Sequence, residues 1–141
     1  MKNDIYPCLW FNGQAREAAE YYCGIFKNAR ILDSNPIVTT FEANGNRFMC
    51  LNGGPEFRFS ESVSFVVSCD SQEEIDYYWD ALTADGGQES QCGWLKDKFG
   101  LSWQIIPAML GSLMSDPEKG RRVMEKLLKM KKLELPVLQS A

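Results

Sequence analysis

Glu17-Ala-Ala-Glu-Tyr-Tyr22 and Glu73-Glu-Ile-Asp-Tyr-Tyr78 stand 56 residues apart and share one Glu-x-x-x-Tyr-Tyr pattern. Each lies in a stretch whose apolar residues recur at helical spacing, and each stretch follows an apolar run that is typical of a strand. The same shift aligns those runs, because Leu9–Phe11 then falls on Phe65–Val67. The match in residues and in element order indicates a chain built from two copies of one unit.

The first copy predicts the order strand, helix, strand and hairpin. Apolar spacing predicts a helix over Gln14–Phe26, and short strands are predicted at 31–32 and 37–41. Asn44-Gly45 then favours a type I′ hairpin turn, which needs positive φ at both central residues. Phe48–Leu51 completes the hairpin.

The second copy predicts a strand over Ser62–Cys69 and a helix that reaches about Ala84. A capping box marks the start of that helix, with the Ser71 hydroxyl and the Glu74 carboxylate accepting hydrogen bonds from unpaired backbone groups. Two strands follow, one over 88–96 and one over 101–106.

We therefore expect an α+β fold of paired βαβββ modules in a single domain, residues 1–141. The internal repeat covers 5–55 and 61–107. Because either half alone has too small a core, the two sheets should form an eight-stranded open barrel or curved sheet around a shared cleft.

Residues 108–141 are predicted to be an added C-terminal helical extension. Asp116-Pro117 is typical of a helix start, with Asp as the N-cap and Pro in the first turn. The helix should run to about Met130 and leave a loose tail.

Charge and hydropathy limit the partners of the chain. Its net charge is −4, with both signs spread along the sequence, whereas a nucleic-acid footprint needs a basic stripe. The basic run at Lys126–Lys132 is best explained as a solvated helix face. The N-terminus has no apolar signal-peptide core, and no stretch reaches the ~18 apolar residues of a membrane span. We expect no nucleic-acid partner, no membrane segment and a cytoplasmic location.

Cysteine and histidine usage limits the chemistry. The five cysteines are odd in number, widely spaced and without a Cys-x-x-Cys pair, which fits reduced thiols in a cytosolic protein. The sequence contains no histidine. This excludes Ser-His-Asp and Cys-His catalysis and every histidine-ligated metal site. Cys92 is either a nucleophile or an inert thiol, and the second interpretation is favoured because no histidine can activate it.

Strand alternation predicts which side chains line the cleft, since neighbouring residues on a strand face opposite sides of the sheet. The ligand-binding cleft candidates are Tyr6, Cys8, Trp10, Arg47, Met49, Ser64 and Gln104. Trp10 belongs either to an aromatic ligand wall or to a core or dimer contact. Arg47 pairs with an anionic substrate or is a solvated charge, and Gln104 orients a ligand or is a structural hydrogen-bonding group.

Three longer motifs carry a family resemblance: Leu9–Ala15, Asn44–Pro55 and Gln91–Pro107. They resemble the PhnB-like branch of the vicinal oxygen chelate superfamily, which includes glyoxalase I and extradiol dioxygenases. The resemblance covers nearly the whole chain and implies the glyoxalase/bleomycin-resistance-like fold. Some members of this branch are labelled as a demethylubiquinone methyltransferase. The sequence shows no Gly-rich nucleotide loop after a strand, so that activity is not expected here.

The resemblance also implies where a metal would bind. Metal-dependent members place His, Glu or Gln ligands on the first and last strands of each half. In this sequence those positions fall near Tyr6 or Cys8, on Met49, near Ser62 or Ser64, and on Gln104. Only the Gln104 amide is a credible oxygen ligand, and one neutral amide does not hold a hard divalent ion. We therefore expect no metal and no cofactor.

Two functional hypotheses follow. In the first, a PhnB-like protein of the glyoxalase superfamily binds a small organic ligand in its cleft without a metal. In the alternative, it is a metal-free or weakly metal-dependent lyase or isomerase that polarises a small carbonyl compound through Tyr6, Cys8 or Arg47. The missing ligand residues favour the first. The resemblance also implies a homodimer, because superfamily members commonly complete their clefts by pairing.

Overall fold

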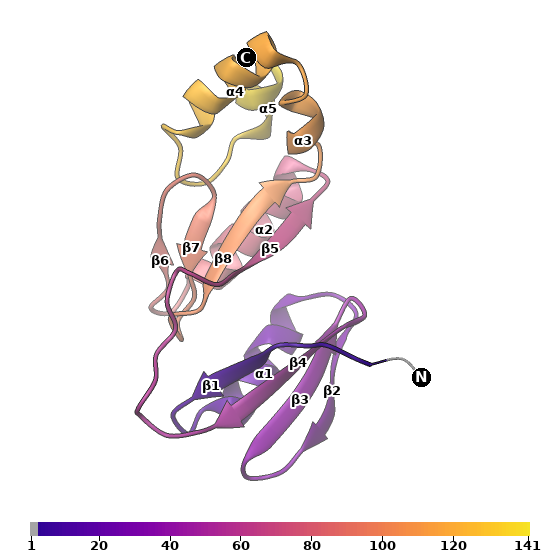
Figure 1. The fold of residues 1–141 in the computed structure, drawn as a ribbon, viewed down its shortest axis with the longest axis vertical. Coiled ribbons are helices and arrows are strands. Elements are labelled where there is room, and N and C mark those ends of the chain that lie inside the picture. The colour runs from indigo at the N-terminus through magenta and orange to yellow at the C-terminus, as the bar shows by residue number, and fades with distance from the viewer. Residues whose placement is uncertain (1–2) are drawn as a thin grey trace. The chain divides into compact units, whose positions relative to one another are not determined.

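The computed structural model describes residues 3–141 and confirms an α+β architecture with two four-stranded sheets. The chain divides into two compact units, the first ending at Phe59 and the second beginning at Ser60. Each unit contains one copy of the predicted repeat, and Figure 1 shows the strands and helices of both. None of the helices in residues 3–141 is long and apolar enough to cross a membrane.

The first unit contains four strands and one helix. In chain order they are β1 (Cys8–Phe11), α1 (Ala15–Ile25), β2 (Ala29–Ser34), β3 (Val38–Ala43) and β4 (Asn46–Asn52). The spatial order of the strands is β1-β4-β3-β2, with β1 parallel to β4 and the other pairs antiparallel.

Helix α1 covers one face of the first sheet and lies behind it in Figure 1. Its alanines at 15, 18 and 19 are fully buried, so the helix backbone approaches the strands closely. Larger side chains fill the remaining space, and the Tyr22 ring stacks on Phe41 with ring centroids 5.7 Å apart. The predicted apolar face of this helix is therefore the core of the first unit.

The Asn52 side chain fixes the start of α1. Its Oδ1 accepts the Ala15 N–H at 2.8 Å, and its Nδ2 donates to the Pro36 carbonyl at 3.1 Å. One amide thus satisfies an unpaired helix N–H and ties together three segments of the chain. The predicted hairpin turn is also present, with positive φ at Asn44 and Gly45 (50° and 82°).

The second unit repeats this plan and adds to it. In chain order its elements are β5 (Ser64–Cys69), α2 (Gln72–Thr83), β6 (Gln88–Glu89), β7 (Trp94–Lys96), β8 (Ser102–Pro107), α3 (Leu110–Leu113), α4 (Pro117–Leu127) and α5 (Leu135–Gln139). Its sheet has the order β5-β8-β7-β6, with β5 parallel to β8. Helix α2 contacts β5, β7 and β8 and covers one face.

The capping box of α2 is present in a modified form. The Ser71 hydroxyl accepts the Glu74 N–H at 3.2 Å, as predicted. The Glu74 carboxylate accepts the N–H of Asp70 at 2.6 Å, one residue ahead of the usual partner in such a box. The two side chains still fix the first turn of the helix from both sides.

The predicted single strand over 88–96 is wrong. β6 and β7 are separate, antiparallel strands, with Gln88 paired to Lys96. The chain reverses through Cys92 and Gly93, which have positive φ of 60° and 86°. An added Cβ at Gly93 would lie 3.1 Å from the Ile105 carbonyl oxygen, so this turn requires glycine for both its φ and its packing.

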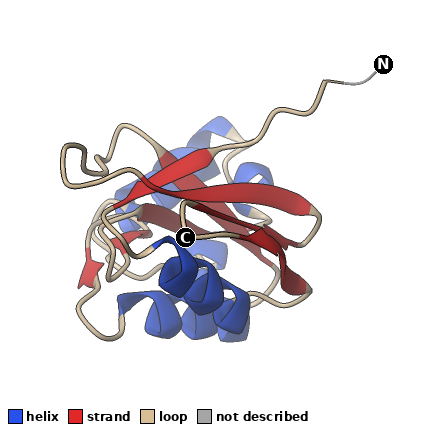
Figure 2. Cartoon of the chain, turned by 90° about the horizontal axis from the view of Figure 1, so that it is seen from below, coloured by secondary structure: helices blue, strands red, loops and turns tan. Residues whose placement is uncertain are grey.

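The predicted loose tail is also wrong. Helix α4 ends at Leu127, and the chain then continues into α5, with Leu133 and Leu138 fully buried. These leucines join Val123 of α4 in a separate apolar cluster. Figure 2 shows the helices of this extension beside the C-terminus. Burial of the leucines explains why the segment is ordered.

Backbone and amide groups attach the extension to the second unit. The Cys92 and Gly93 N–H groups donate to the carbonyls of Met130 and Lys131, both at 2.8 Å. On α2, the Gln72 side chain donates to the Leu133 carbonyl at 3.0 Å and accepts the Leu135 N–H at 2.6 Å. The Gln72 amide thus pairs with the backbone of this segment through one donated and one accepted hydrogen bond, as the backbone of a neighbouring strand would.

Candidate functional site

In the first unit, the cleft candidates lie on the sheet face opposite α1. Leu9 and Phe11 are buried beneath the helix, while Cys8 is exposed and Trp10, which alternates with them, is only partly buried. The register pairs Cys8 with Met49 and Trp10 with Leu51, so these side chains share the other face. The structure thus brings Cys8, Trp10 and Met49 together on one surface.

The Trp10 side chain is held firmly by the segment after β4. Its indole Nε1 donates to the Gly54 carbonyl at 2.8 Å, and Phe57 packs edge-on against its ring with centroids 4.9 Å apart. Gly53 lies beneath the ring, since an added Cβ there would be 2.4 Å from Trp10 Cε2. The Asn52–Pro55 segment therefore holds the Trp10 side chain in place.

Arg47, near the start of β4, and Tyr6, just before β1, form a second group in the first unit. The Arg47 guanidinium carbon lies 5.0 Å from the centre of the Tyr6 ring, in a cation–π arrangement. A guanidinium nitrogen also lies 3.8 Å from the Asp4 carboxylate. Arg47 is thus already engaged with an aromatic ring and an acidic group.

The thiols of the first unit are poor nucleophiles. Partial burial raises the pKa of Cys8. Cys50 on the adjacent strand is completely buried, and burial followed by the proximity of Cys8 and Cys23 raises its pKa to about 12. At neutral pH these thiols remain protonated, whereas the thiolate is the reactive form.

In the second unit, Ser64 and Gln104 meet as a direct hydrogen-bonded pair. The Gln104 Nε2 donates to the Ser64 hydroxyl oxygen at 3.0 Å, across the parallel β5–β8 pair. The two side chains lie on the face away from α2, together with Val66, which is 59% exposed. No hydrogen bond from another described residue reaches the Gln104 carbonyl oxygen.

A row of polar residues crosses this face, one from each strand. The register pairs Gln88 with Lys96, Lys96 with Ser102, and Ser102 with Ser64. Cross-strand partners point to the same side, so an amide, an ammonium and two hydroxyl groups lie side by side at strand spacing. The Gln104 amide and the Trp94 indole form the next row.

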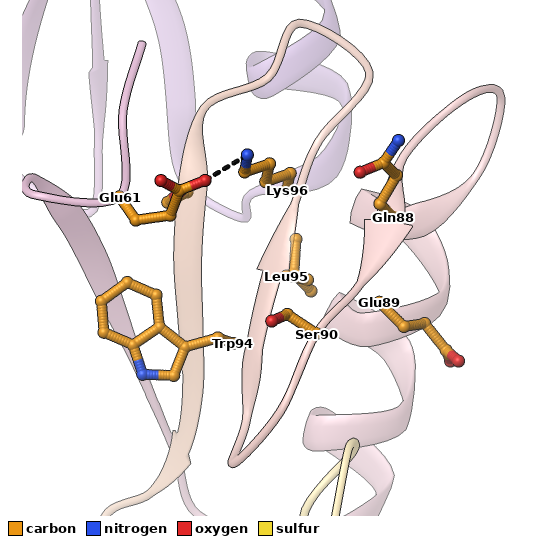
Figure 3. Close-up of a pocket in the computed structure, with 8 residues that line it drawn as sticks. Glu61, Gln88, Glu89, Ser90, Trp94, Leu95 and Lys96 are labelled. Atoms are coloured by element: carbon orange, nitrogen blue, oxygen red, sulfur yellow. Dashed lines mark ion pairs between the residues drawn. The ribbon is translucent and has the colours of Figure 1, made fainter.

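A pocket of about 190 Å³ opens on this row. Its lining includes Glu61, Gln88, Ser90, Trp94, Lys96 and Ser102. Figure 3 shows Glu61 and Lys96 as an ion pair in which the Glu61 carboxylate reaches the Lys96 ammonium. Glu89 also lines the pocket, although it alternates with Gln88 along the strand and its carboxylate accepts the Trp79 indole N–H at 2.7 Å.

Glu61, Lys96 and Ser102 are not among the residues selected from the sequence as cleft candidates. Strand alternation does place Ser102 on the cleft-facing side, because the repeat aligns it with Arg47 on the corresponding strand. Lys96 was hidden by the incorrect single strand over 88–96, and Glu61 lies in the loop before β5, where alternation gives no signal.

The remaining residues considered from the sequence have structural roles or lie apart. Glu17 and Glu73 are both exposed on helix surfaces, as expected. Cys92 is partly buried and packs against the apolar cluster of the extension, in agreement with an inert thiol.

The residues present do not fit the metal site that the superfamily resemblance implies. The corresponding positions carry a thiol and a thioether in the first unit, Cys8 and Met49, and a hydroxyl and an amide in the second, Ser64 and Gln104. Within residues 3–141, no three His, Cys, Asp or Glu side chains form a group able to hold a metal ion. A hard divalent cation prefers several anionic or carbonyl oxygens, which this set does not provide.

Comparison with solved structures shows the fold. The two four-stranded βαβββ modules match the glyoxalase/bleomycin-resistance-like fold. A glyoxalase-related enzyme from Fulvimarina pelagi has a TM-score of 0.54 and 16% identity, over 75% of this chain and 88% of its own. The fosfomycin resistance protein FosX from Listeria monocytogenes, solved with Mn(II) and sulfate, has a TM-score of 0.57 and 16% identity, over 86% and 98%.

The chain belongs to the PhnB-like family described as 3-demethylubiquinone-9 3-methyltransferase, which matches residues 3–106. A protein of that description, a PhnB protein from Bacillus cereus, is 30% identical, with a TM-score of 0.68 over 75% of this chain and 100% of its own. No curated protein matches the sequence. The family match ends at residue 106, within β8, so the C-terminal helices lie outside it.

Proposed function

We propose that this chain is a small-molecule binding domain of the glyoxalase superfamily that works without a metal ion. The observation that carries the proposal is the Gln104–Ser64 pair. Its 3.0 Å hydrogen bond fixes the Gln104 amide on the sheet face away from α2, with the carbonyl oxygen available to a ligand. A fixed polar group beside apolar and aromatic side chains is the usual composition of a small-molecule site.

Several contacts support binding over catalysis. The pKa of the Cys8 thiol is raised by burial, which disfavours a nucleophile. Arg47 is engaged with Tyr6 and Asp4, so polarising a carbonyl would require it to leave both. Methyl transfer is not part of the proposal, because the sequence has no glycine-rich nucleotide loop after a strand. The alternative lyase or isomerase therefore has weaker support.

Native mass spectrometry of the full chain with a panel of organic acids, carbonyl compounds and apolar ring compounds tests the proposal. We expect a one-to-one complex that weakens about tenfold in Gln104→Ala, since a fixed hydrogen-bonding group is lost. Gln14→Ala is the matched control, because Gln14 is exposed and makes no capping hydrogen bond. Unchanged binding in Gln104→Ala would remove Gln104 from the site.

Elemental analysis of the purified chain tests the proposal that the domain works without a metal ion. Because the donor set lacks anionic oxygens, we expect no stoichiometric divalent metal, and a thermal-shift series over Mg²⁺, Mn²⁺, Ni²⁺ and Zn²⁺ should show no ion-specific stabilisation. One bound metal per chain would overturn the metal-free proposal while leaving ligand binding open.

We further propose a cytoplasmic homodimer. The five cysteines are all free, in support of a reducing compartment. Large apolar side chains remain uncovered, among them Phe57 (67% exposed) and Val66 (59%), in support of a second chain. Light scattering coupled to size exclusion should give twice the chain mass of 16.0 kDa, and a monomer at micromolar concentration would contradict this.

A further inference from the structure

The pocket on the second sheet contains a buried hydroxyl that lacks a partner. Ser102 is 1% exposed, and its Oγ is the buried side-chain polar atom without a hydrogen bond within residues 3–141. Buried hydroxyls are nearly always paired, because desolvation without a compensating hydrogen bond is costly. Ser102 is among the residues that line the pocket, so a ligand oxygen that reached this hydroxyl would satisfy it.

A cation stands beside this hydroxyl. Lys96 is the register partner of Ser102 on the neighbouring strand, so its side chain rises from the same face at strand spacing. The ammonium group of Lys96 and the hydroxyl group of Ser102 are both donors, and they rise from neighbouring strands on one face, so one oxygen-rich group can accept from both. A carboxylate is the simplest group that accepts from both.

The structure already places a carboxylate on Lys96, that of Glu61 (Figure 3). Glu61 lies in the loop before β5, outside the sheet, and its side chain is 61% exposed while that of Lys96 is 38% exposed. Ion pairs this exposed contribute little, because water solvates both partners well when they separate. The Glu61 carboxylate can therefore leave Lys96 at low cost when another carboxylate arrives.

The size of the pocket and its other lining residues limit the class of ligand that it can bind. At about 190 Å³ the pocket is smaller than the roughly 300–1,000 Å³ of sites for drug-sized ligands. Gln88 continues the polar row beyond Lys96, and Trp94 adds an apolar ring. This composition suits a short organic acid with a polar substituent.

We propose that this pocket binds a small organic carboxylate, which replaces the Glu61 carboxylate on Lys96 and accepts a hydrogen bond from the Ser102 hydroxyl. Glu61 then acts as an internal competitor, because its carboxylate pairs with the Lys96 ammonium when no ligand is bound. The inference rests on the proposed function and specifies the ligand class of the same sheet face, one row away from Gln104.

Isothermal titration of the full chain with lactate, and with the neutral amide lactamide, tests the proposal at constant ionic strength, because salt screens exposed charges. Lactate should bind and lactamide should not. Lys96→Gln should weaken lactate binding about tenfold or more, since a charge-assisted hydrogen bond is lost. Lys129→Gln, which removes an exposed lysine of the extension, is the matched control and should bind as the original chain does.

Two further lining residues, Ser102 and Glu61, give opposite expectations. Ser102→Ala should weaken lactate binding about threefold to tenfold, through loss of one hydrogen bond. It should leave the urea midpoint unchanged or raised, because the hydroxyl has no hydrogen-bond partner among residues 3–141. Glu61→Gln should strengthen lactate binding severalfold, because the competing carboxylate is removed.

Equal binding of lactate and lactamide, or unchanged lactate binding in Lys96→Gln, would overturn the carboxylate site. Weaker lactate binding in Glu61→Gln would overturn the role of Glu61 as a competitor. Failure here is distinguishable from failure of the proposed function. A neutral ligand that depends on Gln104 but not on Lys96 refutes only this inference, whereas no binding by any compound of the broader panel refutes both.

Discussion

The Asp97 carboxylate accepts the indole N–H of Trp103 at 2.9 Å, and both side chains are buried. The other oxygen of the same carboxylate accepts the backbone N–H groups of Phe99 and Leu101, at 2.9 and 3.1 Å. A buried carboxylate is costly unless it is well hydrogen-bonded, and these three donors provide that compensation. Asp97 therefore fixes the β7–β8 turn and the strand that carries Ser102 and Gln104.

Replacement of Asp97 should destabilise the second unit. Asp97→Ala removes the acceptor of three hydrogen bonds, two of them buried, and we expect a loss of about 2–4 kcal/mol in the free energy of unfolding. Urea titration followed by tryptophan fluorescence measures it. Asp80→Ala, on the exposed surface of α2, is the control and should change stability by less than about 0.5 kcal/mol. Equal effects of the two variants would contradict this role for Asp97.

The glycine beneath Trp10 gives a second prediction. Gly53→Ala places a Cβ 2.4 Å from the indole ring, so the ring or the loop must move. We expect destabilisation of about 1–3 kcal/mol, as for overpacked sites, with a changed tryptophan emission. Gly24→Ala is the matched control, because nothing lies within 4 Å of its added Cβ and α1 gains a better helix former. That variant should be neutral or slightly more stable.

The attachment of the C-terminal extension depends on Gln72. Gln72→Ala removes the hydrogen bonds to the Leu133 carbonyl and the Leu135 N–H, with an expected loss of about 1–3 kcal/mol. Hydrogen exchange should accelerate first in the Leu133–Leu138 segment. Gln14→Ala, at the start of α1, should leave the exchange of that segment unchanged. Uniform acceleration across the whole chain would show that the extension is not a separable unit.

The Asp76–Lys132 pair predicts a pH dependence in acid. The hydrogen bond from Lys132, at 2.8 Å, together with one from Gln72, lowers the pKa of Asp76. A lowered folded-state pKa gives stability that is present above the ordinary value for aspartate, and that is lost as the pH falls through the lowered value. The extension should therefore loosen only in strong acid.

An NMR titration of the Asp76 carboxyl carbon checks this dependence. The pKa of Asp76 should rise towards its ordinary value in Lys132→Gln and stay unchanged in Lys129→Gln. A low pKa that survives the loss of Lys132 would assign the effect to Gln72 alone. In alkaline solution the dependence on pH is reversed, because the hydrogen bond to Asp76 raises the pKa of Lys132. The stability that Lys132 contributes is therefore lost only as the pH rises through its raised pKa.

The repeated elements were predictable because their signals are local. Asn44-Gly45 marks a hairpin by the φ values it tolerates, and the observed turn has them. The predicted helices and most strands agree with the structure to within a few residues. The β6–β7 turn could not be predicted, since a cysteine with positive φ at 92 has no sequence signal, and tertiary contacts with Met130 and Lys131 hold it.

The candidate site was predictable only where strand alternation applied. Alternation placed Cys8, Met49, Ser64 and Gln104 on the sheet faces away from the helices, as the register has them. The Lys96–Glu61 ion pair lay beyond that reasoning, because it joins a misassigned strand to a loop. The packed tail was missed because α5, over Leu135–Gln139, is too short to show a helical period.

The strand order has a consequence for folding of the chain during its synthesis on the ribosome. Among the strands of residues 3–141, β1 has β4 as its one neighbour and β5 has β8, so in each unit the strand made first pairs with the strand made last. The first unit can close its sheet when Asn52 has emerged, whereas the second must wait for Pro107, and its outer helices for Leu138. Since units fold N-terminal first during synthesis, the nascent first sheet stands complete while the second is still being translated.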